Sequence, residues 1–108
     1  MPVKIAAFAQ LKELNIAFNQ IEGRISPGIW EISNLTKLVA DNNLLTGSIP
    51  STIGRLPLTT LSLHENRLTG ALPPEIGNLT ALRGLSISGN LLTGTLPQGL
   101  SRLSSLFF

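Results

Sequence analysis

The sequence predicts an α/β repeat solenoid, in which short coils stack and each coil carries one strand and one return turn. Two observations support this fold class. First, the letters NLLTGSIP, which begin at Asn43, recur as NRLTGALP from Asn66 and as NLLTGTLP from Asn90. Second, these asparagines and Asn19 are spaced by 24, 23 and 24 residues, and a fixed period of this length is the signature of a repeat architecture.

Each repeat begins with a predicted strand. Leu-x-Leu alternation is typical of a strand that buries one face. The apolar residues five and three positions before each asparagine are Leu14 and Ile16, Leu38 and Ala40, Leu61 and Leu63, and Leu85 and Ile87. Ala40 replaces a larger aliphatic residue and leaves a small volume deficit in the predicted core.

A turn and a short return segment follow the strand. The residue four positions after each asparagine is a glycine, which permits a backbone turn that a side chain obstructs: Gly23, Gly47, Gly70 and Gly94. A proline then ends the extended structure in three repeats, and Ser26 replaces it in the first. The segment that follows, as in Glu75–Leu79, is expected to form a short helical turn. A single coil cannot bury its own apolar face, so the coils must stack.

Length and composition allow one small domain over residues 1–108. Of its 108 residues, 43% are hydrophobic and only 13% are charged, against roughly 25% charged residues in an average soluble domain. The eight lysines and arginines are spread singly along the chain, whereas nucleic-acid binding requires a cluster of them. We therefore expect no nucleic-acid partner.

The residue types exclude several kinds of site. The chain has no cysteine and a single histidine, His64, which excludes disulfides, a thiolate nucleophile and a multi-histidine metal site. No apolar run approaches the roughly 18 residues of a membrane span, and the apolar stretch near the N-terminus is too short for a secretory signal. We expect no metal, no cofactor and no membrane segment in this chain.

The combined pattern LxxLxLxxNxLxGxIP resembles the plant-type leucine-rich repeat, with its LTGxIP signature, over nearly the whole chain. The resemblance implies a right-handed superhelix with a parallel β-sheet on its concave face and short 3-10 or irregular turns on its convex face. It also implies recognition of a protein or peptide, as in the ectodomains of receptor-like kinases, receptor-like proteins and polygalacturonase-inhibiting proteins. An extracellular or cell-surface location, as part of a longer parent protein, is a further implication.

The repeat register predicts four full repeats of 23 or 24 residues and partial repeats at both ends. Pro2 falls in the proline column of a preceding repeat, and the segment from Leu103 starts a fifth strand. The cysteine-paired caps that extracellular members of this family carry are absent, so we interpret the chain as an interior fragment of a longer solenoid. We expect the uncapped ends to self-associate end to end, and charges placed at Leu106 and Phe108 to improve solubility.

One repeat is a residue shorter than the others, and Pro57 lies in it. We expect this deletion to narrow the convex side locally. The strands at Leu61–Leu63 and Leu85–Ile87 should still pair in register.

The repeated letters are interpreted as structural. Asparagines at this position are expected to turn inward and bond backbone groups of the neighbouring loop, because a buried amide without partners costs about 1–3 kcal/mol. The predicted ladder consists of Asn19, Asn43, Asn66 and Asn90. These letters build the coil and indicate nothing about what it binds.

The letters that vary predict the binding face. Positions that flank the buried pair of each strand form four exposed columns, and neighbours in a column touch because parallel strands lie about 4.8 Å apart. We expect a protein or peptide ligand to contact mainly the bulkier first half of this face and the His64–Glu65 edge. The candidate contacts are Glu13, Asn15, Phe18, Lys37, Val39, Asp41, Asn42, Thr60, Ser62, His64, Glu65, Ser86 and Ser88.

One column has the order of a nucleophilic triad, because Asp41, His64 and Ser88 occupy successive strands. A triad also needs an oxyanion hole and a pocket that excludes water. An open sheet, whose N–H groups are used in the ladder of strands, offers neither. We therefore predict no catalytic residues and no enzyme activity; a contact between Asp41 and His64 is the more modest alternative.

The letters NLT occur at Asn34 and at Asn78. Both fit the acceptor pattern for N-glycosylation. Because they lie in the return segments, glycans there would leave the concave face open.

The resemblance implies a fragment of a plant receptor-like kinase or receptor-like protein ectodomain, in defence or developmental signalling. A secreted inhibitor of microbial cell-wall hydrolases is the alternative, which a membrane span and kinase elsewhere in the parent would exclude. A third class, an ice-binding solenoid, is suggested by the column Thr46, Thr69 and Thr93, although threonine also suits exposed strand positions. Thermal hysteresis would identify that class.

Overall fold

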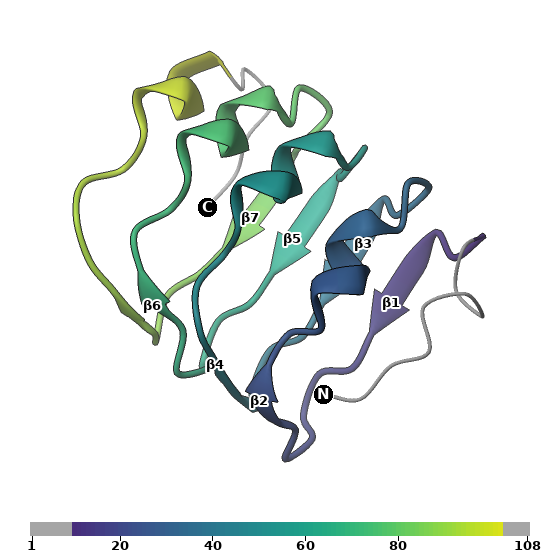
Figure 1. Ribbon diagram of the computed structural model, residues 1–108, viewed down its shortest axis with the longest axis vertical. Coiled ribbons are helices and arrows are strands. Elements are labelled where there is room, and N and C mark those ends of the chain that lie inside the picture. Colours follow the sequence, from purple (N-terminus) through teal and green to yellow (C-terminus); the bar gives the residue numbers. More distant parts are fainter. Residues whose placement is uncertain (1–9, 103–108) are drawn as a thin grey trace.

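The computed structural model describes residues 10–102, and its coils stack side by side into a solenoid (Figure 1). The partial repeats expected at the two ends, with Pro2, Leu103, Leu106 and Phe108, lie outside the described residues. Within residues 10–102, no helix is long and apolar enough to cross a membrane.

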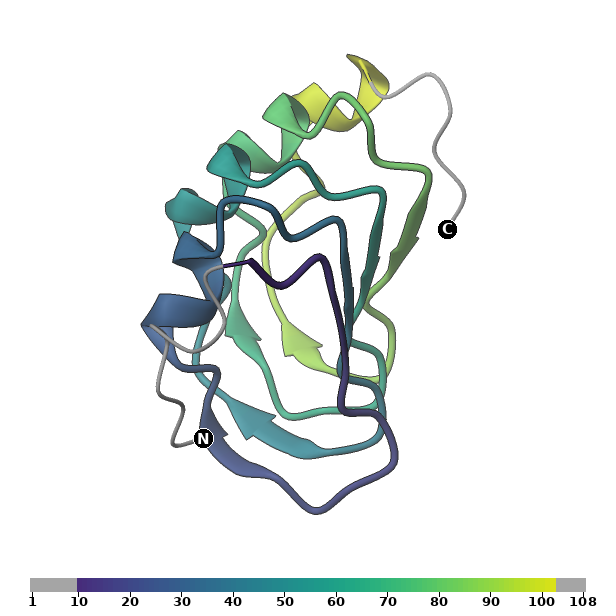
Figure 2. The same cartoon turned by 90° about the vertical axis from the view of Figure 1, so that its right-hand side faces the viewer.

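The first strands of successive coils form one parallel sheet. The sheet has the order β1 (Glu13–Asn15), β3 (Lys37–Val39), β5 (Thr60–Ser62) and β7 (Gly84–Ser86). The return segments are 3-10 helices on the opposite side of each coil (Figure 2). They are η2 (Pro27–Glu31), η3 (Ser51–Arg55), η4 (Pro74–Asn78) and η5 (Gln98–Arg102). The predicted alternation of strand and short helical turn is thus confirmed.

The strand register survives the short repeat. Pro57 lies in the loop directly before β5. Leu61 of β5 nevertheless pairs with Leu38 of β3 and with Leu85 of β7. The prediction that these strands stay in register is therefore confirmed. The missing residue is absorbed between η3 and β5, so the leucine columns stay aligned and continue to face the core.

A second set of short strands was not predicted. β2 (Glu22–Arg24) pairs with β4 (Leu44–Thr46), and β6 (Thr69–Gly70) pairs with β8 (Leu91–Leu92), all in parallel. These pairs lie where the chain turns from the main sheet toward the 3-10 helices (Figure 2). They satisfy backbone groups in a segment that the sequence marks only as a turn.

The apolar columns form one continuous core between the main sheet and the 3-10 helices. Leu38, Leu61 and Leu85 of the strands are buried, as are Ile53 and Ile76 of η3 and η4. Burial of apolar area is the main stabilising term in folding. Since each coil contributes one layer, the core is shared between neighbouring coils.

Two kinds of glycine shape the coils. The turn glycines Gly23, Gly47, Gly70 and Gly94 have φ between 77° and 84°, the left-handed region that glycine enters without steric cost. Glycines of the 3-10 helices instead allow neighbouring coils to approach closely. A Cβ added to Gly77 would lie 2.7 Å from the Cα of Gly99.

Candidate functional site

We call the outward surface of the β1-β3-β5-β7 sheet and of the loop residues directly after it the strand face. Its side chains come from the four columns that flank the buried leucines. Glu13 and Lys37 illustrate the contact between column neighbours, since their charged groups lie 3.7 Å apart. Both side chains are at least half exposed, so this pair contributes little to stability.

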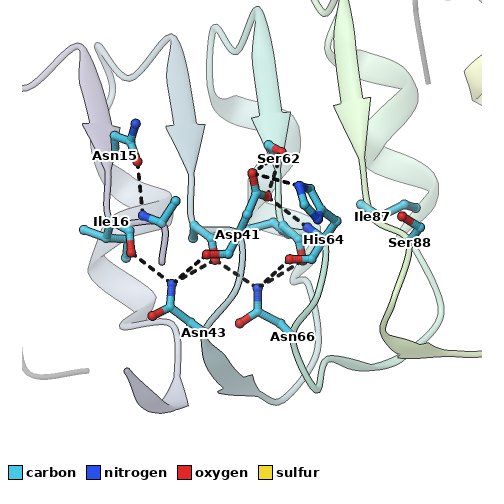
Figure 3. A network of polar contacts seen from close by, with 12 residues as sticks. Asn15, Ile16, Asp41, Asn43, Ser62, His64, Asn66, Ile87 and Ser88 are labelled. Carbon is cyan, nitrogen blue, oxygen red and sulfur yellow. Dashed lines mark hydrogen bonds and ion pairs between the residues drawn. The ribbon is translucent and has the colours of Figure 1, made fainter. Parts of the chain in front are cut away.

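The asparagine ladder borders the strand face (Figure 3). The Asn43 side-chain amide donates hydrogen bonds to the carbonyls of Ile16, Ala40 and Asp41 at 2.9–3.2 Å. Its oxygen accepts a hydrogen bond from the N–H of Ile21. One side chain thus joins its own loop to the previous coil through backbone atoms alone.

Asn66 and Asn90 repeat this arrangement one and two coils later. Asn66 donates to a carbonyl of the previous coil, that of Ala40, and accepts from Leu45 N–H. Asn90 donates to the carbonyl of Leu63 in the same manner. Asn19 differs, because it is exposed and, within residues 10–102, its amide bonds only carbonyls of its own loop, those of Ile16 and Ala17.

Asp41 corrects one expectation about the strand face. The sequence places it in an exposed column, yet the residue is only 8% exposed. Its carboxylate accepts hydrogen bonds of 2.7 and 2.9 Å from the Ser62 hydroxyl and one of 3.0 Å from the His64 N–H. Asp41 therefore holds two neighbouring coils together, and its burial follows from bonds to the next strand.

The expected contact between Asp41 and His64 is present. The Nε2 atom of His64 lies 3.2 Å from the Asp41 carboxylate (Figure 3). The rest of the triad is not assembled, because within residues 10–102 no hydrogen bond joins the His64 ring to the Ser88 hydroxyl. Instead the Ser88 carbonyl accepts a hydrogen bond from the N–H of Glu65. The column has the order of a triad and the geometry of a structural network.

The outermost column of the strand face has an unusual backbone conformation. Phe18, Asn42, Glu65 and Gly89 have φ of 57°, 56°, 57° and 68°. Asparagine and glycine tolerate this left-handed region, whereas other residues pay roughly 1–2 kcal/mol. Phe18 and Glu65, for which this conformation is energetically unfavourable, are also exposed, and the exposed fraction of Phe18 is 80%. The sequence analysis identified this column but not its left-handed conformation, which the turn-forming residues Asn42 and Gly89 could have indicated.

The remaining candidate contacts divide by exposure and by hydrogen bonding. Val39, Thr60 and Ser86 are partly buried in the sheet surface. Asn15 is exposed, but its side-chain oxygen accepts a hydrogen bond from the N–H of Ala17. Phe18, Glu65 and Ser88 are exposed, and within residues 10–102 their side chains form no hydrogen bond or ion pair.

The other predicted sites lie away from the strand face. Asn34 and Asn78 are both exposed on the return side of the coils, and the Asn34 amide donates to Gln10 over 3.4 Å. The threonine column is exposed on the second set of strands and just beyond it, at Thr46, Thr69 and Thr93. Within residues 10–102 no group of three or more acidic, histidine or cysteine residues could hold a metal ion.

The Leucine Rich Repeat family profile matches residues 10–32, 34–56, 57–79 and 81–103. The chain belongs to the leucine-rich-repeat family. Comparison with curated proteins yields no significant match. Solved structures of plant proteins, however, match these repeats over most of the chain.

The leucine-rich-repeat chain is similar to the ectodomain of the Arabidopsis receptor kinase HAESA, solved in complex with an IDA peptide hormone ligand. Identity is 32% and the TM-score is 0.90, over 94% of this chain and 17% of that chain. It also matches the structure of the BIR3–SERK2 complex from Arabidopsis thaliana with 39% identity and a TM-score of 0.80, over 86% of this chain and 50% of that chain. A plant ice-binding protein matches with 33% identity and a TM-score of 0.87, over 94% of this chain and 33% of that chain.

These leucine-rich repeats cover at most half of the chains named above. The chain spans 15% of a plant peptide hormone receptor chain and 12% of the ectodomain chain of a plant membrane receptor kinase. The similarity therefore extends to an ectodomain-like module within much longer solenoids.

Proposed function

We propose that this chain is a non-catalytic recognition module that binds a protein or peptide along the strand face. The observation that carries the proposal is the placement of Phe18 and Glu65 on this face, where each combines exposure with a costly backbone conformation. Strained and exposed residues often lie at binding sites. The similarity to receptor ectodomains solved with peptide hormones supports the same function.

The proposal includes the setting of the module. It forms part of the ectodomain of a plant receptor-like kinase or receptor-like protein, at the cell surface, in defence or developmental signalling. Exposed acceptor asparagines at Asn34 and Asn78 suit a secreted protein. Expression through an insect secretory route should add glycan mass at both sites, and single Asn→Gln variants should each remove one glycan. Secreted chain without added mass at either site would contradict this setting.

The binding function can be tested with peptides from plant extracellular fluid. Peptides retained by the immobilised full chain are identified by mass spectrometry, resynthesised and titrated by calorimetry. The strand-face variants Phe18→Asn and Glu65→Asn should weaken binding by about tenfold, which is about 1.4 kcal/mol. Asparagine tolerates their backbone conformation, so both variants keep the fold.

The matched control changes an acidic residue on the opposite side of the coil. Glu31 is exposed at the end of η2, and Glu31→Asn should bind each resynthesised peptide as the unsubstituted chain does. Equal affinity of the strand-face and control variants would refute recognition along the strand face. So would the absence of any retained peptide.

Ice binding is a second candidate, favoured by the similarity to a plant ice-binding protein and by the exposed threonine column. The surface around this column is uneven, however, because Arg67 and Leu91 occupy equivalent exposed positions beside it. Thermal hysteresis measured on the full chain decides between the candidates. If the chain shows thermal hysteresis and the Thr69→Lys variant does not, the function is ice binding and not recognition of a protein or peptide.

A further inference from the structure

An open hollow of about 570 Å³ lies where the strands β3, β5 and β7 begin. The surface is depressed at β7 because Gly84, which pairs with Thr60 in the sheet, has no side chain. A Cβ added to Gly84 would make only ordinary van der Waals contact, 3.9 Å from the Thr60 side chain, so the surface of β7 has room for a further group. The hollow is lined by Lys37, Thr59, Thr60, Thr80, Ala81 and Arg83.

The lining carries two cations and no acidic residue. Arg83 is exposed, and within residues 10–102 its guanidinium forms no ion pair or hydrogen bond. Lys37 is paired with Glu13 at 3.7 Å, and an exposed pair of this kind is weak enough to be replaced by another anion. The hollow therefore presents positive charge that the fold does not use.

Hydroxyl groups supply further donors. Thr59 donates its hydroxyl to the carbonyl of Thr36 at 3.1 Å. In the described part of the chain, the hydroxyls of Thr60 and Thr80 form no hydrogen bond. Two free hydroxyls thus accompany the two cations around one empty space.

The backbone of the hollow offers few donors, because among its lining residues only the N–H of Ala81 is without a hydrogen bond within residues 10–102. The N–H groups of Thr59 and Thr60 both donate to the carbonyl of Thr36, and those of Arg83 and Gly84 both donate to the carbonyl of Thr59. Phosphate sites in proteins commonly use several free backbone N–H groups. The fork of a guanidinium matches a carboxylate as well as a phosphate, so the shortage of free backbone N–H groups is what distinguishes the two anions here. The donor set therefore favours a carboxylate.

We propose that this hollow is a subsite for a carboxylate of an acidic peptide segment, held by Arg83 and Lys37 with the Thr60 and Thr80 hydroxyls. The inference rests on the proposed function and specifies the chemistry of one group of the partner. Strands β3 and β7 are two strand spacings apart, about 10 Å. The long side chains of Lys37 and Arg83 can close on one carboxylate across this distance.

The test is an NMR titration of the full chain with a capped tetra-aspartate peptide at low salt, with tetra-asparagine and inorganic phosphate as comparison probes. Tetra-aspartate should shift the amide resonances of Thr60, Thr80 and Gly84 saturably, and tetra-asparagine should not. The Arg83→Gln variant should weaken tetra-aspartate binding by about tenfold, as expected for loss of a hydrogen-bonded charge. Thr60→Val should weaken it less and leaves the charge unchanged.

The matched control is Arg67→Gln, which removes an exposed arginine outside the hollow. It should change tetra-aspartate affinity by less than about twofold. An equal loss in both arginine variants would mean attraction to net charge and would overturn the subsite. Saturable shifts with phosphate but not with tetra-aspartate would overturn the carboxylate assignment, as would the absence of shifts with either anion.

The outcome is separable from that of the proposed function. A natural peptide that loses affinity in the Phe18→Asn variant but binds Arg83→Gln normally would contradict the subsite alone. A peptide indifferent to Phe18→Asn would contradict the strand face, whatever the titration of the hollow shows.

Discussion

The side-chain amide of Asn66 donates a 2.9 Å hydrogen bond to the backbone carbonyl of Ala40, one coil earlier. Asn66 also donates to the carbonyls of Leu63 and His64 and accepts from the N–H of Leu45. No side chain of the neighbouring coil takes part. The ladder is therefore a main-chain joint that an asparagine side chain completes.

Asn66→Ala should lower the free energy of unfolding by about 3 kcal/mol, because it leaves buried backbone groups without partners. Asn19→Ala is the matched control, since Asn19 is exposed and, in the described part of the chain, bonds only its own loop. It should cost less than about 1 kcal/mol. Urea denaturation followed by circular dichroism measures both. Equal losses would show that the bonds to the neighbouring coil add nothing.

Gly77→Ala should destabilise the fold by about 2 kcal/mol, because its Cβ would meet backbone atoms of Gly99 and force the coils apart. Gly84→Ala introduces the same methyl group without a clash, because its nearest neighbour, Thr60 Cγ2, would lie at an ordinary contact distance of 3.9 Å. It should leave stability unchanged or raise it by up to about 1 kcal/mol. Thermal unfolding of the two variants provides the comparison, and a tolerated Gly77→Ala would disprove the close packing of η4 and η5.

Asp41→Ala should cost about 2 kcal/mol, because the His64 N–H and the Ser62 hydroxyl lose their acceptor in a largely buried place. Ser62→Ala removes one donor and leaves the bond from His64, so we expect about half of that loss. Chemical denaturation of the single variants and of the double variant would show coupling between the two residues. Strictly additive losses would mean that Asp41 and Ser62 stabilise the fold independently.

Phe18→Asn should raise the free energy of unfolding by about 0.5 kcal/mol, since asparagine enters the left-handed region at lower cost than phenylalanine. Little burial is lost, because Phe18 is 80% exposed. Phe18→Ala removes the same ring without relieving the backbone, and should not stabilise. Thermal unfolding of both variants separates the two effects. A destabilised Phe18→Asn would mean that the ring contributes packing.

The sequence was sufficient to predict the features that depend on the period. The pairing of Leu61 with Leu85 and the 3-10 turn over Pro74–Asn78 both follow from letters that recur at fixed spacing. Such features depend on which residues face the core, and burial of the repeated leucines determines that.

Other features depend on how one coil meets the next, and no single repeat reveals them. The burial of Asp41 depends on Ser62 and His64, which lie in the following coil. The second set of strands involves backbone pairing, to which side-chain letters contribute little. The close approach of Gly77 to Gly99 could not be predicted without knowing the distance between the two 3-10 helices. Glycine in a 3-10 turn has no special dihedral angle that would indicate it.

The ladder asparagines bond only main-chain atoms of the neighbouring coil. These hydrogen bonds therefore do not depend on which side chains that coil carries. Whole units of 23 or 24 residues can thus be duplicated, deleted or exchanged without loss of the asparagine hydrogen bonds, whereas residue-specific contacts such as that of Asp41 with Ser62 must be retained or replaced. Each such unit includes its own variable residues of the strand face. Duplication, deletion or exchange of coils during evolution can therefore change the ligand that such a surface binds, while the asparagine hydrogen bonds between coils stay the same.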